Sequence, residues 1–350
     1  MTILYILLAI FLLGVLITVH EFGHFIAARL TGIAVKEFAV GFGPKLIKWR
    51  SKKHDTLFAL RPIPLGGYCM FYGDETDPEG VNDPRAFDRA KVWKRALTVF
   101  SGPLMNFVLA FVLAVVLMAG YGMTVVQPYL DTVEAGMPAQ AAGLLPGDVL
   151  LSAGGEALPI GDASALTAAI AKLAPGESLP LTVRRGEETI TVSIAPMWDE
   201  AEGRNRIGVG IKAYGPLQSG QWLPAAFDSC VYASTVILKS LGALFTTGEG
   251  IQDAAGPIGV VQLVAEQTRT GGLETFLNLA VIISINLGLV NLLPIPGLDG
   301  SRLVFFLIEA IRRKPVSRKI ETAVHLTGYA LLLGLMAFFT FQDVGRLLGG

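Results

Sequence analysis

The residues best placed for chemistry are His20, Glu21 and His24, in the run His20-Glu21-Phe22-Gly23-His24. In a helix, side chains four positions apart lie on one face, so both imidazoles can bind one metal ion while Glu21 stands beside it. Zinc hydrolases use this arrangement: two histidines and a third ligand hold the ion, and the glutamate accepts a proton from water. Because the short pattern HExxH also occurs by chance, a metal site needs support from the rest of the chain.

A candidate third ligand, Asp299, lies in the run from Asn291 to Gly300, which reads NLLPIPGLDG. The two prolines and the glycine in this run should end an apolar helix and turn the carboxylate inward. A carboxylate inside an apolar segment is costly unless it is paired, close to water or bound to a cation, which makes Asp299 a functional candidate. The alternative is that Asp299 caps a following helix from Ser301 to Ile311.

The composition indicates a membrane protein. Of the 350 residues, 52% are hydrophobic and 16% are charged, and the mean hydropathy is +0.55. The net charge of -1 and the lack of an evident basic face exclude nucleic acid as an expected partner. The N-terminus lacks the basic start and small-residue cleavage site of a signal peptide, so the first apolar segment is expected to remain as a helix.

Four stretches are apolar over the roughly 20 residues that a bilayer requires: Ile3 to about Leu30, Leu97 to Gly120, Phe276 to Leu298, and Thr322 to Phe341. Residues 31–95 carry twelve Lys and Arg and the short segment 300–321 carries six, so both are expected to face the cytoplasm. Segment 121–272, with eight basic and fifteen acidic residues, is expected outside together with both termini. This topology separates Cys69 from Cys230, and no disulfide is expected.

Within this topology, His20 and Asp299 lie at similar depths. At 1.5 Å per residue, His20 is about 26 Å from the outer start of its helix, and Asp299 is roughly 34 Å from the start of its own. Both residues therefore belong to the cytoplasmic half of the membrane. The matching depth favours Asp299 as a metal ligand over a simple helix cap.

Residues 31–95 are predicted to form short strands instead of an ordinary loop. Apolar residues alternate with turn formers at 38–44 and again at 56–67. The strands either dip into the membrane beside a water-filled cavity near His20, where non-helical backbone is tolerated, or form a small cytoplasmic β-domain. The sequence pattern favours neither alternative.

Residues 125–197 have the pattern of a soluble module. Turn-forming and apolar runs at 133–150 and alternating apolar residues within 181–192 predict strands, turns and one helix around Ala165–Leu173. The module resembles a bacterial PDZ domain, with Met137 where the pattern usually has serine. PDZ domains bind extended chain ends by adding a strand to their sheet. The alternative is a plug or spacer that binds nothing.

The stretch Gln221–Thr247 is apolar but contains Asp228 and Lys239. Its large apolar residues recur at helical spacing with polar residues between them, which suits an amphipathic helix at the membrane interface. If this stretch crossed the membrane, the following span would be reversed and the basic segment 300–321 would emerge outside. An interfacial helix is therefore expected.

These segments predict a polytopic α-helical membrane protein of about four transmembrane helices, with a membrane-associated β-hairpin region and one inserted extracytoplasmic α+β PDZ domain. The predicted domains, in order, are a transmembrane helix with HExxH at 1–30, a cytoplasmic or membrane-re-entrant β region at 31–95, a second transmembrane helix at 96–121, the PDZ domain at 122–200, an extracytoplasmic linker with the interfacial helix at 201–272, a third transmembrane helix with Asp299 at 273–300, a cytoplasmic loop or helix at 301–321, and a fourth transmembrane helix at 322–343.

The chain resembles the site-2 metalloproteases, and specifically the bacterial regulator-of-sigma-E type with an inserted PDZ domain. His20 to His24 match the HExxH of this family, Asn291 to Gly300 match its NxxPxPxLDG motif, and Gly41-Phe42-Gly43-Pro44 match its GFGP loop. Lesser signatures stand in the family order: Pro64 to Tyr68, Ser101-Gly102-Pro103 followed by Asn106, and Gly256-Pro257-Ile258.

The resemblance implies intramembrane proteolysis of transmembrane segments, with substrates such as anti-sigma factors or signal-peptide remnants, in the bacterial inner membrane. It implies one Zn²⁺ bound by His20, His24 and Asp299, with Glu21 as the catalytic residue. It also implies a set of substrate-binding residues: Asn291, Pro294, Gly41, Phe42 and Gly43. The expected partners are membrane-protein substrates, a peptide or chain end at the PDZ domain, and the lipid bilayer.

Two other classes of protein remain as alternatives. A metal-binding transporter also places His and Asp inside the membrane, but it usually has repeated halves, and no such repeat is found. A non-catalytic membrane PDZ scaffold would not need Glu21.

Overall fold

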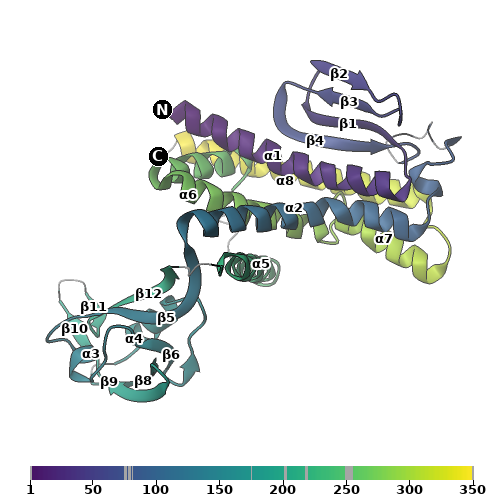
Figure 1. The fold of residues 1–350 in the computed structure, drawn as a ribbon. Coiled ribbons are helices and arrows are strands. Elements are labelled where there is room, and N and C mark those ends of the chain that lie inside the picture. Colours follow the sequence, from purple (N-terminus) through teal and green to yellow (C-terminus); the bar gives the residue numbers. More distant parts are fainter. Residues whose placement is uncertain are drawn as a thin grey trace. The chain divides into compact units, whose positions relative to one another are not determined.

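The computed structural model describes residues 2–74, 77, 80, 82–174, 176–200, 203–216, 220–248 and 255–348. The chain divides into two compact units (Figure 1). The first unit combines Met1–Leu117 with Cys230–Gly350, and the second is Met118–Ser229. The predicted catalytic residues all belong to the first unit.

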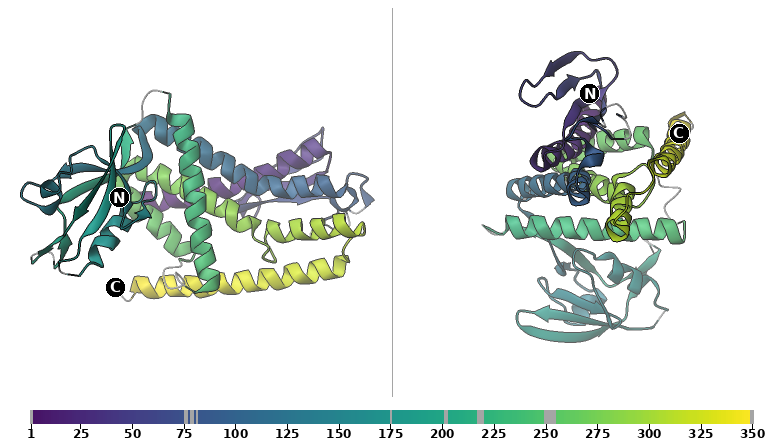
Figure 2. Two further views of the ribbon diagram at one scale, coloured as in Figure 1. Left: turned by 90° about the horizontal axis from the view of Figure 1, so that it is seen from below. Right: turned by 90° about the vertical axis from the view of Figure 1, so that its right-hand side faces the viewer.

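Four long helices form the body of the first unit: α1 (Thr2–Thr31), α2 (Val92–Tyr121), α6 (Pro257–Leu292) and α8 (Arg318–Leu348). They run side by side in Figures 1 and 2. Within the described residues, four helices are long and apolar enough to cross a membrane, and they are these four. Their number agrees with the sequence prediction, although α2 begins at Val92, ahead of the predicted boundary at 96.

Small residues let the helices approach closely. A buried cluster joins Ala9, Leu12 and Leu16 of α1 to Val264 and Ala280 of α6. A side chain has no room where α1 crosses α2, because a Cβ atom on Gly23 would lie 2.1 Å from the carbonyl oxygen of Ser101. Only glycine permits this backbone approach, which occurs one residue from His24.

Helix α6 is broken near its middle and ends at a proline-rich run. Gly272 has non-helical angles (φ 67°, ψ -154°) and divides α6 into 257–271 and 273–292. Asp343 of α8 accepts hydrogen bonds from the amides of Gly256 and Gly259 at 3.2 and 2.8 Å, which holds the start of α6. After Leu292 the proline-rich run interrupts the helix, and α7 (Asp299–Arg312) then begins with Asp299 itself.

A four-stranded sheet lies between α1 and α2 in the sequence: β1 (Val35–Phe42), β2 (Ile47–Arg50), β3 (Leu57–Leu60) and β4 (Ile63–Phe71). Its order is β2-β3-β1-β4, with β1 parallel to β3 and antiparallel to β4. The sequence prediction of strands in this region is confirmed. β4 is the strand beside α1 (Figure 1), and a Cβ on Gly14 of α1 would lie 2.6 Å from the Pro64 carbonyl oxygen.

The second unit is built on a six-stranded sheet with the order β12-β5-β6-β8-β9, in which β7 pairs with β6. Its core is formed by buried aliphatic residues, among them Leu130, Leu150, Leu166 and Leu181. The helix expected around Ala165–Leu173 is present as α4. The elements are β5 (Met123–Val133), α3 (Pro138–Ala141), β6 (Val149–Ala153), β7 (Glu156–Ala157), α4 (Ser164–Ala171), β8 (Leu179–Arg185), β9 (Glu188–Ile194), β10 (Met197–Asp199), β11 (Arg204–Arg206) and β12 (Val209–Pro216).

The sheet of this unit extends beyond residue 200, the predicted end of the module. β12 pairs antiparallel with β5, from Val209 opposite Val133 to Pro216 opposite Met123. The local alternation of β12 gives no sign of this pairing, because its partner is the first strand of the module. After β12, the helix predicted at 221–247 is present as α5 (Trp222–Thr246). Cys69 and Cys230 are free, as expected.

Candidate metal centre

Three side chains converge at the crossing of α1 and the start of α7. His20 Nε2 and His24 Nε2 are 3.2 Å apart, and Asp299 Oδ2 lies 3.0 Å from the first and 3.3 Å from the second. Both histidines are buried and the aspartate is nearly so. Helical spacing brings the imidazoles together, and the break before α7 turns the carboxylate toward them.

The geometry of this triangle fits a bound cation. Ligand atoms about 2.0–2.1 Å from a tetrahedral zinc ion lie about 3.3 Å from one another, close to the three distances found here. Asp299 Oδ2 is also buried, and although it lies close to both imidazole nitrogens, no hydrogen bond satisfies it. A buried carboxylate oxygen without a hydrogen bond is expensive, and a metal ion would remove this cost. The residues present therefore fit zinc.

Helix α2 supports both histidines. His24 Nδ1 lies 2.9 Å from the carbonyl oxygen of Thr98, to which it donates, so that its Nε2 has a lone pair free for a metal. His20 Nδ1 lies 3.0 Å from the side-chain amide of Asn106, which is fully buried. Gly102 lies between these two residues on α2, and a Cβ there would be 2.3 Å from His24 Nε2 and 3.0 Å from His20 Nε2.

A cavity of about 400 Å³ opens beside the three ligands. Glu21 and Asn291 line it, as do Tyr68 and Cys69 of β4, and Arg302 of α7. The backbone of β4 comes close to the glutamate, because a Cβ on Gly67 would be 3.6 Å from Glu21 Cγ. The three clustered side chains, the Glu21 carboxylate and an extended strand thus share one cavity.

The other predicted substrate-binding residues lie outside this cavity. Pro294 is exposed in the break before α7, and the segment Gly41-Phe42-Gly43 ends β1 with positive φ angles of 85° and 102° at its two glycines. A Cβ on Gly41 would lie 2.7 Å from the Arg61 carbonyl oxygen, so this glycine is required by the approach of the chain before β4. The Phe42 side chain is 46% exposed. A role for these residues in binding substrate stays a prediction.

A polar network holds β4 next to this segment. Arg61 donates to the Gly43 carbonyl at 2.6 Å and to Glu37 at 2.9 Å, and the Tyr68 hydroxyl donates to Glu37 at 2.8 Å. Burial raises the pKa of Glu37, but hydrogen bonds from Lys45, Tyr68 and Arg61 outweigh it and leave the pKa below its ordinary value. Burial and the Glu37 carboxylate raise the pKa of Tyr68 to about 12. Tyr68 therefore remains a protonated hydrogen-bond donor at the cavity wall.

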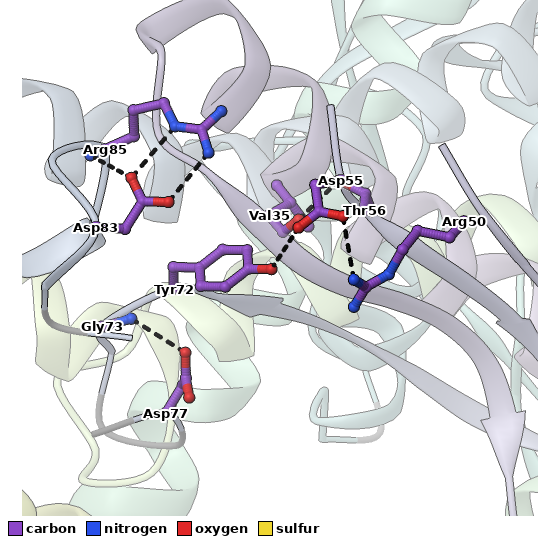
Figure 3. Close-up of polar contacts among 9 residues, drawn as sticks. All are labelled: Val35, Arg50, Asp55, Thr56, Tyr72, Gly73, Asp77, Asp83 and Arg85. Atoms are coloured by element: carbon purple, nitrogen blue, oxygen red, sulfur yellow. Dashed lines mark hydrogen bonds and ion pairs between the residues drawn. The ribbon is translucent and has the colours of Figure 1, made fainter. Parts of the chain in front are cut away.

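Exposed ion pairs mark another part of the sheet region (Figure 3). Arg50 pairs with Asp55 at 3.1 Å, and the Tyr72 hydroxyl donates to the same aspartate at 3.2 Å. Asp83 pairs with Arg85 at 3.0 Å, and hydrogen bonds from Arg85 hold the pKa of Asp83 below its ordinary value. Exposed charges of this kind are costly in hydrocarbon, which favours an aqueous position for this part of the sheet region.

Several residues at the site were not predicted to act there. The motif that includes Gly102 and Asn106 is visible in the sequence, but its spacing does not indicate contact with the histidines. Thr98 acts through its backbone carbonyl, which leaves no signal in the sequence. His325 of α8 is buried with Nδ1 3.4 Å from the Gly297 amide, and it lies outside the triangle of His20, His24 and Asp299.

Comparisons with known proteins agree with this site. The model of peptidase family M50 matches residues 8–335. Two relatives assigned as zinc metalloproteases are each 38% identical: all3971 of Nostoc sp. strain PCC 7120, over 98% of this chain and 96% of its own, and slr1821 of Synechocystis sp. strain PCC 6803, over 98% and 95%. Zinc metalloprotease RasP of Oceanobacillus iheyensis is 28% identical over 97% of this chain and 98% of its own.

Among solved structures, a PDZ domain of the SdrC-like protein from Listeria monocytogenes matches 24% of this chain and 85% of its own, with 19% identity and a TM-score of 0.22. A likeness this weak carries no argument about the second unit.

Proposed function

Because the chain belongs to peptidase family M50, we propose that His20, His24 and Asp299 bind one Zn²⁺ and that Glu21 is the general base of the reaction. The protein is an intramembrane zinc metalloprotease. The observation that supports these roles is the triangle of ligand atoms 3.0–3.3 Å apart, with Glu21 lining the same cavity. A non-catalytic scaffold or a metal transporter is not favoured.

Zinc, when bound, supplies a Lewis acid that makes a water easier to deprotonate and polarises a peptide carbonyl. Glu21 takes the proton from the attacking water and returns it to the departing amine. Thr98 keeps the His24 ring oriented, and the crossing of α1 and α2 at Gly23 and Gly102 keeps both rings in place.

The substrate is a transmembrane segment whose scissile bond is protected by helical hydrogen bonds until that segment unwinds. β4 offers a template for the unwound chain, because its residues 68–71 line the cavity and within the described sheet it pairs with β1 alone. Strand addition along β4 would satisfy the backbone groups that unwinding exposes. Asn291 at the cavity and Gly41, Phe42, Gly43 and Pro294 near it complete the proposed substrate-binding set.

The protein is a multi-pass membrane protein, and its orientation is part of the proposal. The twelve basic residues of 31–95 and the six of 300–321 support an orientation in which these segments and the catalytic cavity face the cytoplasm, in a bacterial inner membrane. The second unit is then an extracytoplasmic PDZ domain that binds a peptide or chain end, with α5 as an interfacial helix. Anti-sigma factors or signal-peptide remnants are the proposed substrates.

The test replaces Glu21 with Gln in the full-length protein and measures zinc content and cleavage of a transmembrane reporter. Glu21→Gln should keep zinc and lose cleavage, whereas His24→Ala and Asp299→Ala should lose both. Glu266→Gln is the matched control, since Glu266 is an exposed glutamate paired only at the surface with Arg269. Unchanged cleavage by Glu21→Gln, or native protein without bound zinc, would overturn the proposal.

A further inference from the structure

Asn106 is the least explained polar residue near the ligands. It lies in α2 and is fully buried, with its side-chain nitrogen 3.0 Å from His20 Nδ1. Its side-chain oxygen Oδ1 is buried without a hydrogen-bond partner. Its backbone carbonyl accepts a hydrogen bond from the Ser284 hydroxyl of α6 at 2.8 Å.

This orientation of the amide conflicts with metal binding. If Asn106 Nδ2 donates to His20 Nδ1, the single proton of the neutral imidazole must be on Nε2. Nε2 is the atom that faces His24 and Asp299, and with a proton it has no lone pair for a metal. The oxygen and nitrogen of an amide have almost the same shape, so their assignment follows from the hydrogen bonds they must make. Exchanging them gives the orphaned oxygen a donor and frees His20 Nε2.

The spacing of α2 supports the exchanged orientation. Thr98, Gly102 and Asn106 are four residues apart and form one stripe on the helix, opposite His24 and His20 of α1. Thr98 provides an acceptor for His24 Nδ1, and Gly102 leaves room for both rings. Asn106 occupies the equivalent position for His20.

We propose that Asn106 is a positioning residue, an inference that rests on the proposed zinc site. Its Oδ1 accepts a hydrogen bond from His20 Nδ1, so the lone pair of His20 Nε2 is left for the metal. Helix α2 then provides an acceptor for the Nδ1 proton of each histidine: the Thr98 backbone carbonyl for His24 and the Asn106 side-chain carbonyl for His20. Acceptors of this kind orient metal-binding histidines and increase their basicity.

Two substitutions distinguish an acceptor from a donor at this position. Asn106→Asp keeps an oxygen and loses the donor, and Asn106→Leu removes both at similar size. Zinc affinity is measured on the full-length detergent-purified protein by competition with a chelator, and ligand geometry by the visible spectrum of the Co²⁺ form. Asn106→Leu should weaken zinc binding about 10–100-fold. Asn106→Asp should bind zinc within a few-fold of the native protein and give a native Co²⁺ spectrum.

Ser284→Ala is the matched control, because it removes a hydrogen bond to the Asn106 backbone and leaves the His20 contact untouched. It should bind zinc as the native protein does. If Asn106→Asp binds as poorly as Asn106→Leu while both fold, or if Asn106→Leu binds normally, the proposal is wrong. Should either variant fail to fold, ring-nitrogen NMR of ¹⁵N-histidine in the native zinc form decides, since it must show a proton on His20 Nδ1. A native protein that binds no zinc would instead overturn the proposed function.

Discussion

Adding one methyl group at Gly102 should abolish metal binding. A Cβ there would lie 2.3 Å from both Cε1 and Nε2 of His24 and 3.0 Å from Nε2 of His20, against 3.4–4 Å for ordinary contact. To accept alanine, the His24 ring must move by roughly 1 Å. Zinc ligands tolerate deviations of only about 0.2 Å, so His24 and the ion cannot keep their positions together.

The magnitude follows from this displacement. A misplacement of about 1 Å costs roughly 100-fold in catalysis, so Gly102→Ala should lower cleavage of a transmembrane reporter by about 100-fold or more. Zinc content, measured by elemental analysis of the purified protein, should fall with it. The helix itself should not suffer, since alanine is better than glycine in a helix interior by about 1 kcal/mol.

Gly120→Ala separates the two effects. Gly120 lies on the same helix, and a Cβ there would meet nothing within 4 Å. This control gains the same helix propensity but leaves zinc content and cleavage unchanged. Native zinc content and cleavage in Gly102→Ala would refute the geometry of the α1–α2 crossing described above.

Two further predictions concern ion pairs away from the ligands. Asp148, 1% exposed at its side chain, is paired with Arg185 at 2.7 Å, and this hydrogen bonding holds the pKa of Asp148 below its ordinary value. Asp148→Asn should therefore destabilise the second unit by about 1–3 kcal/mol at neutral pH, measured by thermal unfolding. The difference in unfolding free energy from the native protein should shrink as the pH falls through the native pKa of Asp148, because protonation then removes the ion pair in the native protein too. A pH-independent difference would contradict this assignment. Arg95 of α2 pairs with Glu309 of α7 at 2.6 Å between largely buried side chains. Glu309→Gln should therefore lower stability by about 1–3 kcal/mol and weaken zinc binding, because α7 begins with Asp299. Native zinc affinity in a destabilised Glu309→Gln would show that this ion pair does not hold Asp299 in place.

The sequence identifies the histidines and the glutamate because their relation is local. Helical spacing alone puts His20 and His24 on one face, and an uncharged run before them defines the helix. Asp299 is found through its interrupted motif and its depth. The helical spacing and the motif each lie within a single segment, and the depth follows from the charges of the segments between the apolar stretches.

The residues that support the ligands are harder to predict. Thr98, Gly102 and Asn106 lie next to the histidines because α2 crosses α1 at these residues. The apolar pattern of neither helix indicates where along its length the crossing occurs. The same limit applies to β12, whose partner β5 is remote in the sequence. Both features are determined by packing between distant segments, and a local sequence pattern does not predict such packing.

The division of the ligands between the two ends of the chain has a consequence for biosynthesis. His20 and His24 enter the membrane with the first helix, whereas Asp299 follows only after α6 has been made. A nascent chain therefore has two imidazoles but lacks the third proposed zinc ligand until the start of α7 has been translated. The enzyme becomes competent late in its own synthesis, and membrane segments inserted beside the growing chain are not exposed to an early protease.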